Sequence, residues 1–297
     1  MDILISFLQG LIRGLSPGAT YAIIAIGYTM VYGIAKMLNF AHGDVIMVGC
    51  YTIALTVSAF VHPLWGVLVA VLLAVVICTV LGITVEKVAY KPLRGAPSLS
   101  VLITAIGVSY LLQSVAEFFF TDSLEPKTAV INGSLQFGYF SIDYSTLLAI
   151  GIAAVIMVAL TLFIKYSRAG RAMVAVSEDR DAARLMGINT DAIITLTFAI
   201  GSALAALAGW LMLSKGTYTI STVGALPGIM AFSAAVIGGI GSIPGAMVGG
   251  LLLGLIEGVV VAFNLDPFVT PIQFALLILV LLIKPAGLLG KARREKV

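Results

Sequence analysis

The chain has 297 residues, of which 60% are hydrophobic and only 10% are charged, and its formal net charge is +3. Its mean hydropathy is +1.12. A soluble globular domain carries about 25% charged residues, so this composition excludes a soluble protein and indicates an integral membrane protein.

Long apolar segments recur along the chain and predict membrane-spanning helices. A hydrocarbon core of ~30 Å needs about 20 helical residues, and the segments lack the alternation that is typical of barrel strands. They lie at 4–35, 43–61, 64–85, 98–120, 145–164, 191–213, 226–240, 243–263 and 268–283. All are long enough to span except 226–240, whose small residues predict a broken or re-entrant helix. We therefore expect an all-α polytopic bundle of eight long transmembrane helices plus one short segment.

No linker, low-complexity tract or tandem repeat interrupts this pattern, so we expect a single transmembrane domain over 1–297. Cytoplasmic loops retain Lys and Arg, and most of the basic residues cluster in three places. These are Lys87, Lys91 and Arg94; Lys165, Arg168, Arg171, Arg180 and Arg184; and Lys284, Lys291, Arg293, Arg294 and Lys296. The loop 121–144 instead carries Asp122, Glu125 and Asp143 against Lys127. The N-terminus is then outside and the C-terminus cytosolic, with 226–240 counted as a ninth crossing.

Several kinds of site are not expected. The chain has no G-x-x-x-x-G-K-[ST] phosphate loop, so it cannot hydrolyse a nucleotide by that route. Its two histidines and two cysteines form no metal-ligand cluster, and Cys50 and Cys78 fall inside apolar segments. We expect no catalytic residue, no cofactor, no metal site and no nucleic-acid partner.

The inner loop 165–190 is too long for a simple turn, and its middle has the character of an amphipathic helix. Its apolar positions are Ala172, Val176, Ala183 and Met186, and its charged face carries Glu178, Asp179, Arg180 and Arg184. One interpretation is a solvated helix along the membrane surface. The other is a rigid helix that docks into a cytosolic partner, with small alanines at the contact and Gly187 as its stop.

Within this loop, Asp181-Ala182-Ala183-x-x-x-Gly187 resembles the Glu-Ala-Ala-x-x-x-Gly coupling segment of binding-protein-dependent ABC importers, with Asp in place of Glu. The stretches "AIGYTMVYGIAKMLNFAHGD", "SRAGRAMVAVSEDRDAARLMGINT" and "AFSAAVIGGIGSIPGAMVGGLLLGLIE" are similar to signature stretches of the permeases of high-affinity branched-chain amino acid ABC transporters, of the H-type subunit. The resemblance runs from Gly14 to Leu289 in the same motif order.

The resemblance implies a type II-like ABC importer permease in the bacterial inner membrane. The implied partners are a second homologous permease, two cytosolic ATP-binding subunits, a periplasmic substrate-binding protein and membrane lipid. In this scheme the ATPase contact is made by Ser177, Glu178, Asp179, Asp181, Ala182, Ala183 and Gly187. Permeases for urea and short amides share much of the pattern, so urea and short amides are an alternative substrate class.

Polar residues inside or beside the apolar segments are candidates for the translocation pathway or its gate. Asn39, His42 and Asp44 lie between the first two segments. Either Asn39 and Asp44 cap the second helix while His42 bonds a nearby loop, or the segment is a broken helix that lines the pathway. Glu257 lies in a spanning segment and must be paired, protonated or at an interface. Gly245 belongs to a run suited to close helix packing or to a hinge at the gate.

Three functions compete at this stage. The leading one is a permease half of an ATP-driven amino acid importer, because a multi-spanning chain without a phosphate loop carries a coupling-like loop. The second is a secondary transporter with His42, Asp44 and Glu257 as an ion relay. The third is a passive channel for a small neutral solute such as urea, for which the long inner loop has no purpose.

Overall fold

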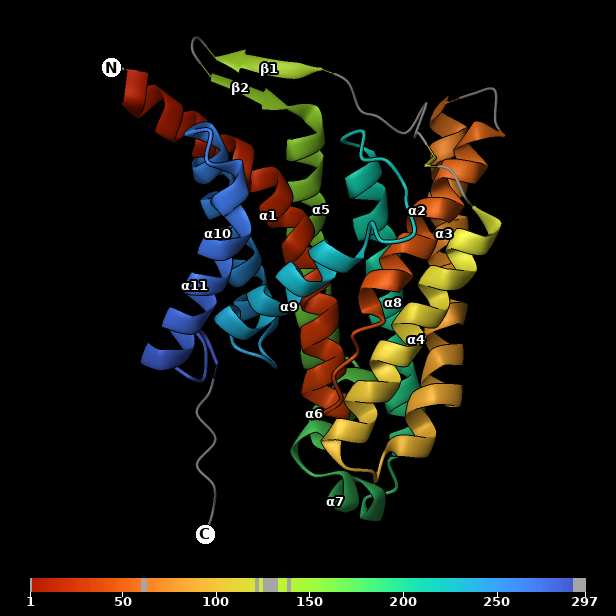
Figure 1. Ribbon diagram of the computed structural model, residues 1–297. Helices are drawn as coiled ribbons and strands as arrows, with labels where there is room; N and C mark the ends of the chain where they lie inside the picture. The colour runs from red at the N-terminus through yellow and green to blue at the C-terminus, as the bar shows by residue number, and fades with distance from the viewer. Residues whose placement is uncertain (1, 60–62, 121–122, 125–132, 138–139, 291–297) are drawn as a thin grey trace. The chain divides into compact units, whose positions relative to one another are not determined.

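The computed structural model describes residues 2–59, 63–120, 123–124, 133–137 and 140–290 (Figure 1). These residues form helices joined by short connections, together with one hairpin. The helices are α1 Asp2–Ala35, α2 His42–Ser58, α3 Pro63–Val85, α4 Ser98–Phe119, α5 Tyr144–Tyr166, α6 Arg168–Glu178, α7 Arg180–Leu185, α8 Thr190–Leu213, α9 Ala225–Gly238, α10 Ile243–Ala262 and α11 Val269–Ile283. Shorter turns are the π-helix η1 Glu86–Tyr90 and the 3₁₀ turns η2 Lys91–Leu93 and η3 Asp266–Phe268.

Seven helices in the described part of the chain are long and apolar enough to cross a membrane. They cover Ile3–Ala35, Trp65–Leu93, Ser98–Phe119, Tyr144–Tyr166, Thr190–Leu213, Ile243–Ala262 and Asp266–Ile283. The expected all-α polytopic fold is confirmed, but the number of long helices differs by one. The second apolar segment, 43–61, forms the 17-residue helix α2, which reaches only roughly 26 Å at ~1.5 Å per residue. The segment 226–240 forms the 14-residue helix α9, short as expected.

The chain divides into two compact units. The first unit comprises 1–29, 132–158 and 230–297, and the second comprises 30–131 and 159–229. In the second unit, α2, α3 and α8 pack against one another, and α4 packs on α2 (Figure 1). Small residues allow the helices to approach, since a Cβ added to Gly49 would stand 3.2 Å from the Cα of Ala206. Cys50 and Cys78 are free thiols buried in this core.

In the first unit, α1 and α10 run antiparallel and pack through small residues spaced four apart on each helix. A Cβ added to Gly10 would lie 2.8 Å from the carbonyl oxygen of Gly258, and one added to Gly14 would meet Gly254. Further along, Gly250 faces Ala22. Because no side chain separates the backbones at these positions, the two helices pack in direct contact along three turns.

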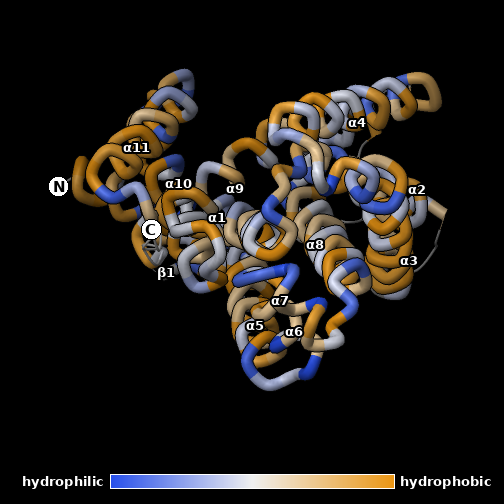
Figure 2. Tube along the Cα trace, turned by 90° about the horizontal axis from the view of Figure 1, so that it is seen from below, coloured by the Kyte–Doolittle hydropathy of each residue, from blue (hydrophilic) through white to orange (hydrophobic). Residues whose placement is uncertain are grey.

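The loop 121–144 contains a short hairpin. Strands β1 Ser134–Phe137 and β2 Phe140–Asp143 pair antiparallel, with Ser134 opposite Asp143 and Phe137 opposite Phe140. The charges at Asp122, Glu125 and Lys127 lie outside the described residues, as do Lys291, Arg293, Arg294 and Lys296 of the tail. Figure 2 shows hydrophilic positions at the connection between α6 and α7, whereas α3 is hydrophobic along most of its length.

Candidate functional site: the 165–190 loop and its polar anchors

The 165–190 loop forms two short helices rather than one. Ser167 caps α6, its Oγ accepting from the backbone N of Gly170 at 2.8 Å. The helix stops at Asp179, whose backbone is extended at φ −152° and ψ 115°. The Asp179 carboxylate then accepts from the backbone N of Asp181 at 2.9 Å and of Ala182 at 3.0 Å. The single helix expected here is therefore wrong, because Asp179 is a better helix cap than a helix interior residue.

The candidate coupling residues are distributed over both helices. Ser177 and Glu178 form the last turn of α6, Asp179 is the break, and Asp181, Ala182 and Ala183 lie in α7. Gly187 follows α7 at φ +81° and donates its N–H to the carbonyl of Arg184 at 2.9 Å. Only glycine adopts this left-handed conformation without strain, so Gly187 ends the helix as the sequence predicts.

The tip of α7 presents two exposed apolar side chains. Leu185 is 89% exposed and Met186 is 82% exposed, whereas Met173, Val176 and Ala183 are buried. The assignment of Met186 to the same apolar face as Val176 is therefore wrong. The cause is the break at Asp179, which starts a new helix and changes the direction in which later side chains point.

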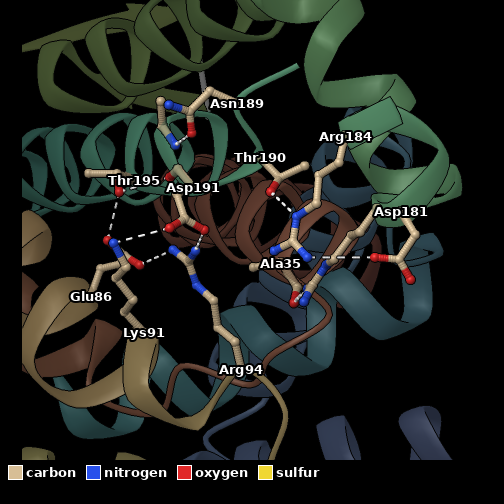
Figure 3. Close-up of polar contacts among 12 residues, drawn as sticks. Ala35, Glu86, Lys91, Arg94, Asp181, Arg184, Asn189, Thr190, Asp191 and Thr195 are labelled. Atoms are coloured by element: carbon tan, nitrogen blue, oxygen red, sulfur yellow. Dashed lines mark hydrogen bonds and ion pairs between the residues drawn. The ribbon is translucent and has the colours of Figure 1, made fainter. Parts of the chain in front are cut away.

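A network of charged side chains joins the turns η1 and η2, which follow α3, to the start of α8 (Figure 3). Glu86 is fully buried, and Arg94 bonds both Glu86 and Asp191. Thr195 donates to the second oxygen of Glu86 at 2.7 Å, and Lys91 lies 3.1 Å from Asp191. A buried carboxylate is tolerated only when it is paired and hydrogen-bonded, and here both oxygens of Glu86 have partners.

Two arginines of α7 tie the loop to this region. The Arg180 guanidinium donates to the carbonyl of Ala35 at the end of α1, and Arg184 Nε donates to Thr190 Oγ1 at 3.0 Å (Figure 3). Burial, together with the positive charges of Arg94 and Arg184, lowers the pKa of the Arg180 guanidinium from its ordinary value. Arginine remains protonated at any physiological pH, so the helix end and the loop are joined by a charge-assisted bond.

Sequence reasoning missed the roles of Glu86, Arg94 and Asp191. Lys91 and Arg94 served only as markers of orientation, although a carboxylate stands at the end of one apolar segment and another at the start of a second. Acidic residues at the edges of spanning helices, close to basic clusters, are a signal for such pairing.

Asn39, in the connection between α1 and α2, and Asp44, in the first turn of α2, bond to other helices. Asn39 Oδ1 accepts from the Tyr90 hydroxyl at 2.8 Å, and Asp44 Oδ1 accepts from Gln113 Nε2 at 2.8 Å. Helix α2 starts after Ala41 without a side-chain cap. The capping interpretation of Asn39 and Asp44 is therefore wrong. The Oδ1 atom of Asn39 bonds to η1 instead, and the Oδ1 atom of Asp44 bonds to α4. His42 is buried at the first position of α2.

Glu257 lies in the first unit and is held by neutral partners. The Tyr21 hydroxyl donates to its Oε2 at 2.8 Å, and Gln273 Nε2 donates to the same oxygen at 3.3 Å. The contact joins α10 to α1 and α11.

Gly245 lies in the first turn of α10, where Ser242 Oγ accepts its N–H at 3.1 Å. A Cβ on Gly245 would meet the carbonyl of Gly238, so this residue packs α10 against α9.

Long apolar helices packed through small residues, with a charged loop outside the spans, define a polytopic helical membrane protein. The fold resembles that of a solved metal-chelate type ABC transporter in an inward-facing conformation, with a TM-score of 0.51, 15% sequence identity, and coverage of 93% of this chain and 85% of the other.

The chain belongs to the family described as the permease component of branched-chain amino acid transport systems, whose model matches residues 10–283. It is 44% identical over 301 residues to the high-affinity branched-chain amino acid transport permease LivH of Escherichia coli K12, with 98% of each chain covered. It is 46% identical over 303 residues to the corresponding permease BraD of Pseudomonas aeruginosa PAO1, again with 98% of each covered. The chain is thus a permease subunit of an ABC importer.

Proposed function

We propose that the chain pairs with a second homologous permease to form an import pathway for branched-chain or other neutral amino acids. A soluble receptor delivers the substrate, and two cytosolic ATPases drive the conformational cycle. The high identity to LivH and BraD over nearly the whole chain supports this substrate class. The test is the uptake of labelled leucine in the presence of unlabelled competitors. Suppression by isoleucine but not by urea would support the amino acid substrate class, and suppression by urea alone would favour the amide alternative.

The coupling role is proposed for α7 and its flanks, and one observation carries it: the exposed tip formed by Leu185 and Met186. Two large apolar side chains on a charged loop are costly in water and typical of a contact with another protein. The tip is held firmly, because Asp179 caps the helix and Arg180 and Arg184 bond it to the ends of α1 and α8. A force applied at the tip is therefore transmitted to two membrane helices.

The test is to replace Leu185 or Met186 by Glu and to measure both co-purification of the ATPase subunits and ATP-driven uptake. We expect both to fall at least about tenfold, since a buried unpaired charge costs well over the ~1.4 kcal/mol that this factor represents. The matched controls are Leu185→Met and Met186→Leu, which keep an apolar tip and should keep both activities. Normal assembly and uptake in the Glu variants would refute the coupling assignment.

We also propose the orientation: N-terminus outside, C-terminus cytosolic, and the 165–190 loop on the cytosolic side. The basic residues of this loop support it. Because Cys50 and Cys78 are buried, a single added cysteine at Ala182 reports sidedness. Labelling of intact cells by an impermeant maleimide at that position would contradict the orientation, and labelling only after the membrane is opened would support it.

Asn39, His42, Asp44 and Glu257 are proposed to belong to the pathway or its gate, together with Gly245. For Asn39, His42, Asp44 and Glu257 the support is a polar side chain within or beside an apolar helix, where such residues are rare and generally functional. For Gly245 the support is its place in the first turn of α10, against α9.

A further inference from the structure

A pocket of about 310 Å³ lies within the second unit, beside the bond between Arg180 and Ala35. Three of its lining residues are basic, Lys36, Arg94 and Arg180, and none of the residues that line it is acidic. The other walls are mostly apolar, with Leu38, Leu93 and Val101 among them. This volume is at the lower end of the range of small-molecule sites, about 300–1,000 Å³.

The charges around the pocket do not cancel. Arg94 is offset by its salt bridges to Glu86 and Asp191, and Asp191 also contacts Lys91 (Figure 3). Among the described residues no salt bridge involves Arg180, whose guanidinium bonds the carbonyl of Ala35. Lys36 adds a further positive charge to the wall, and its Nζ donates to the carbonyl of Gly33 at 2.6 Å. The pocket therefore has an excess of positive charge.

The backbone at the pocket is itself unusual. Lys36 has φ +53°, a left-handed conformation that non-glycine residues seldom adopt. Such positions cost roughly 1–3 kcal/mol and concentrate at ligand sites. Here this conformation occurs at the residue directly after α1, and Lys36 is itself part of the pocket lining.

The pocket is formed at helix ends. Ala35, Leu93 and Ser98 all line it, and each is the terminal residue of a candidate span. These residues mark the level at which helices leave the hydrocarbon and meet the phosphate groups of the lipid. Basic pockets at this level bind phosphate head groups, and arginine matches a phosphate with two parallel hydrogen bonds.

We propose that this pocket binds a phosphate oxyanion through Lys36 and Arg180. Arg94, which is held in place by its two salt bridges, is the third basic residue of the lining. The oxyanion comes either from an anionic lipid head group or from free phosphate in the cytosol. Phosphate binding at this site does not require the importer to be active. Occupancy would hold the end of α1 and the start of α7 together through one shared ligand.

The experiment measures thermal unfolding of the full chain, purified with the subunits that accompany it. It uses nanodiscs of phosphatidylcholine alone, nanodiscs that also contain phosphatidylglycerol, and phosphatidylcholine nanodiscs with inorganic phosphate against chloride of equal ionic strength. We expect one of the two phosphate sources to raise the unfolding temperature by about 3 °C or more. A rise with phosphatidylglycerol assigns the site to a lipid head group, and a rise with inorganic phosphate assigns it to the free ion.

The variants locate the effect. Lys36→Gln and Arg180→Gln should lose most of the rise. Lys87→Gln should keep it, because Lys87 is an exposed basic residue of η1 that does not line the pocket. Ala96→Trp fills the pocket without removing a charge and should also abolish the rise, which protects the test if a charge variant folds poorly. No rise with either source, equal loss in Lys87→Gln, or a full rise in Ala96→Trp would overturn the proposal.

Discussion

At the scale of single residues, the carboxylates of Glu86, Asp44 and Glu257 each accept hydrogen bonds from nearby side chains. Glu86 is buried against Arg94 and Thr195, Asp44 accepts from Gln113, and Glu257 accepts from Tyr21. Arg94 is a cation, whereas Gln113 and Tyr21 are neutral donors. Removing a neutral hydrogen-bond partner leaves a polar group unsatisfied, whereas removing Arg94 leaves a buried carboxylate without its cation.

Arg94→Ala is expected to lower the free energy of unfolding by about 3–5 kcal/mol, because Glu86 remains buried without its cation. Lys91→Ala removes another cation from Asp191, but this pair is half-exposed, and such pairs contribute about 0–1 kcal/mol. Denaturant titrations of both variants in one detergent measure the difference. Equal losses would show that burial of Glu86 does not govern the network.

Asp44→Asn and Glu257→Gln separate a pathway role from a structural one. Each amide oxygen can still accept the bond from Gln113 or Tyr21, so the unfolding temperature should stay within about 2 °C of that of the wild type. If the charge belongs to the pathway or its gate, uptake should fall by about tenfold. Glu117→Gln, at an exposed position, is the control and should leave uptake unchanged. Normal uptake in both variants would remove these residues from the pathway.

At the scale of elements, close helix contacts depend on the absence of side chains. Helices α1 and α10 face each other through Gly10, Gly14, Gly254 and Gly258. In lipid, helices associate by packing and hydrogen bonding rather than by hydrophobic burial. The small residues therefore determine where α10 sits against α1 in the first unit.

Gly254→Ala should destabilise the protein by about 1–3 kcal/mol, because the new Cβ would collide with the backbone of Gly18 and Gly14. The same change at Gly107 or Gly151 meets no atom within 4 Å and should be neutral or slightly stabilising, since alanine favours the helix. Thermal unfolding of the three variants measures the contrast. An unfolding temperature of Gly254→Ala equal to that of the wild type would show that α1 and α10 do not pack closely.

Asp179→Ala tests the start of α7. Loss of the cap costs about 1 kcal/mol of local helix stability, enough to populate an unfolded tip, so uptake should fall while global unfolding is unchanged. Asp179→Asn preserves a side-chain oxygen that caps as well as aspartate does and should retain uptake. Equal impairment in the two variants would mean that the charge, rather than the cap, is required.

At the scale of the whole molecule, hydropathy predicts the spans well because each depends on some twenty consecutive residues. The break at Asp179 depends on the backbone of one residue, which a pattern averaged over several turns does not resolve. Arg94 and Asp191 are 97 positions apart in the chain, so only the packing of α3 on α8 brings them together. Of the two alternatives for Asn39 and Asp44, capping fails for the same reason, since their hydrogen-bond partners lie on helices that are distant in the sequence.

Different parts of the molecule serve different tasks. The spans and their glycine contacts build the membrane part, and the exposed tip of α7 is the surface that we propose for the contact with an ATPase. We propose that the chain contributes the route for the solute and that the energy comes from ATP hydrolysed on another subunit.

The most direct test is reconstitution of the purified chain in liposomes, alone and with its second permease, its ATPases and its soluble receptor. Leucine uptake should require all of these subunits, together with ATP on the side of the membrane where the ATPases lie. It should vanish when the Leu185→Glu chain replaces the wild type. Accumulation of leucine against a gradient by the isolated chain, without ATP, would contradict the account.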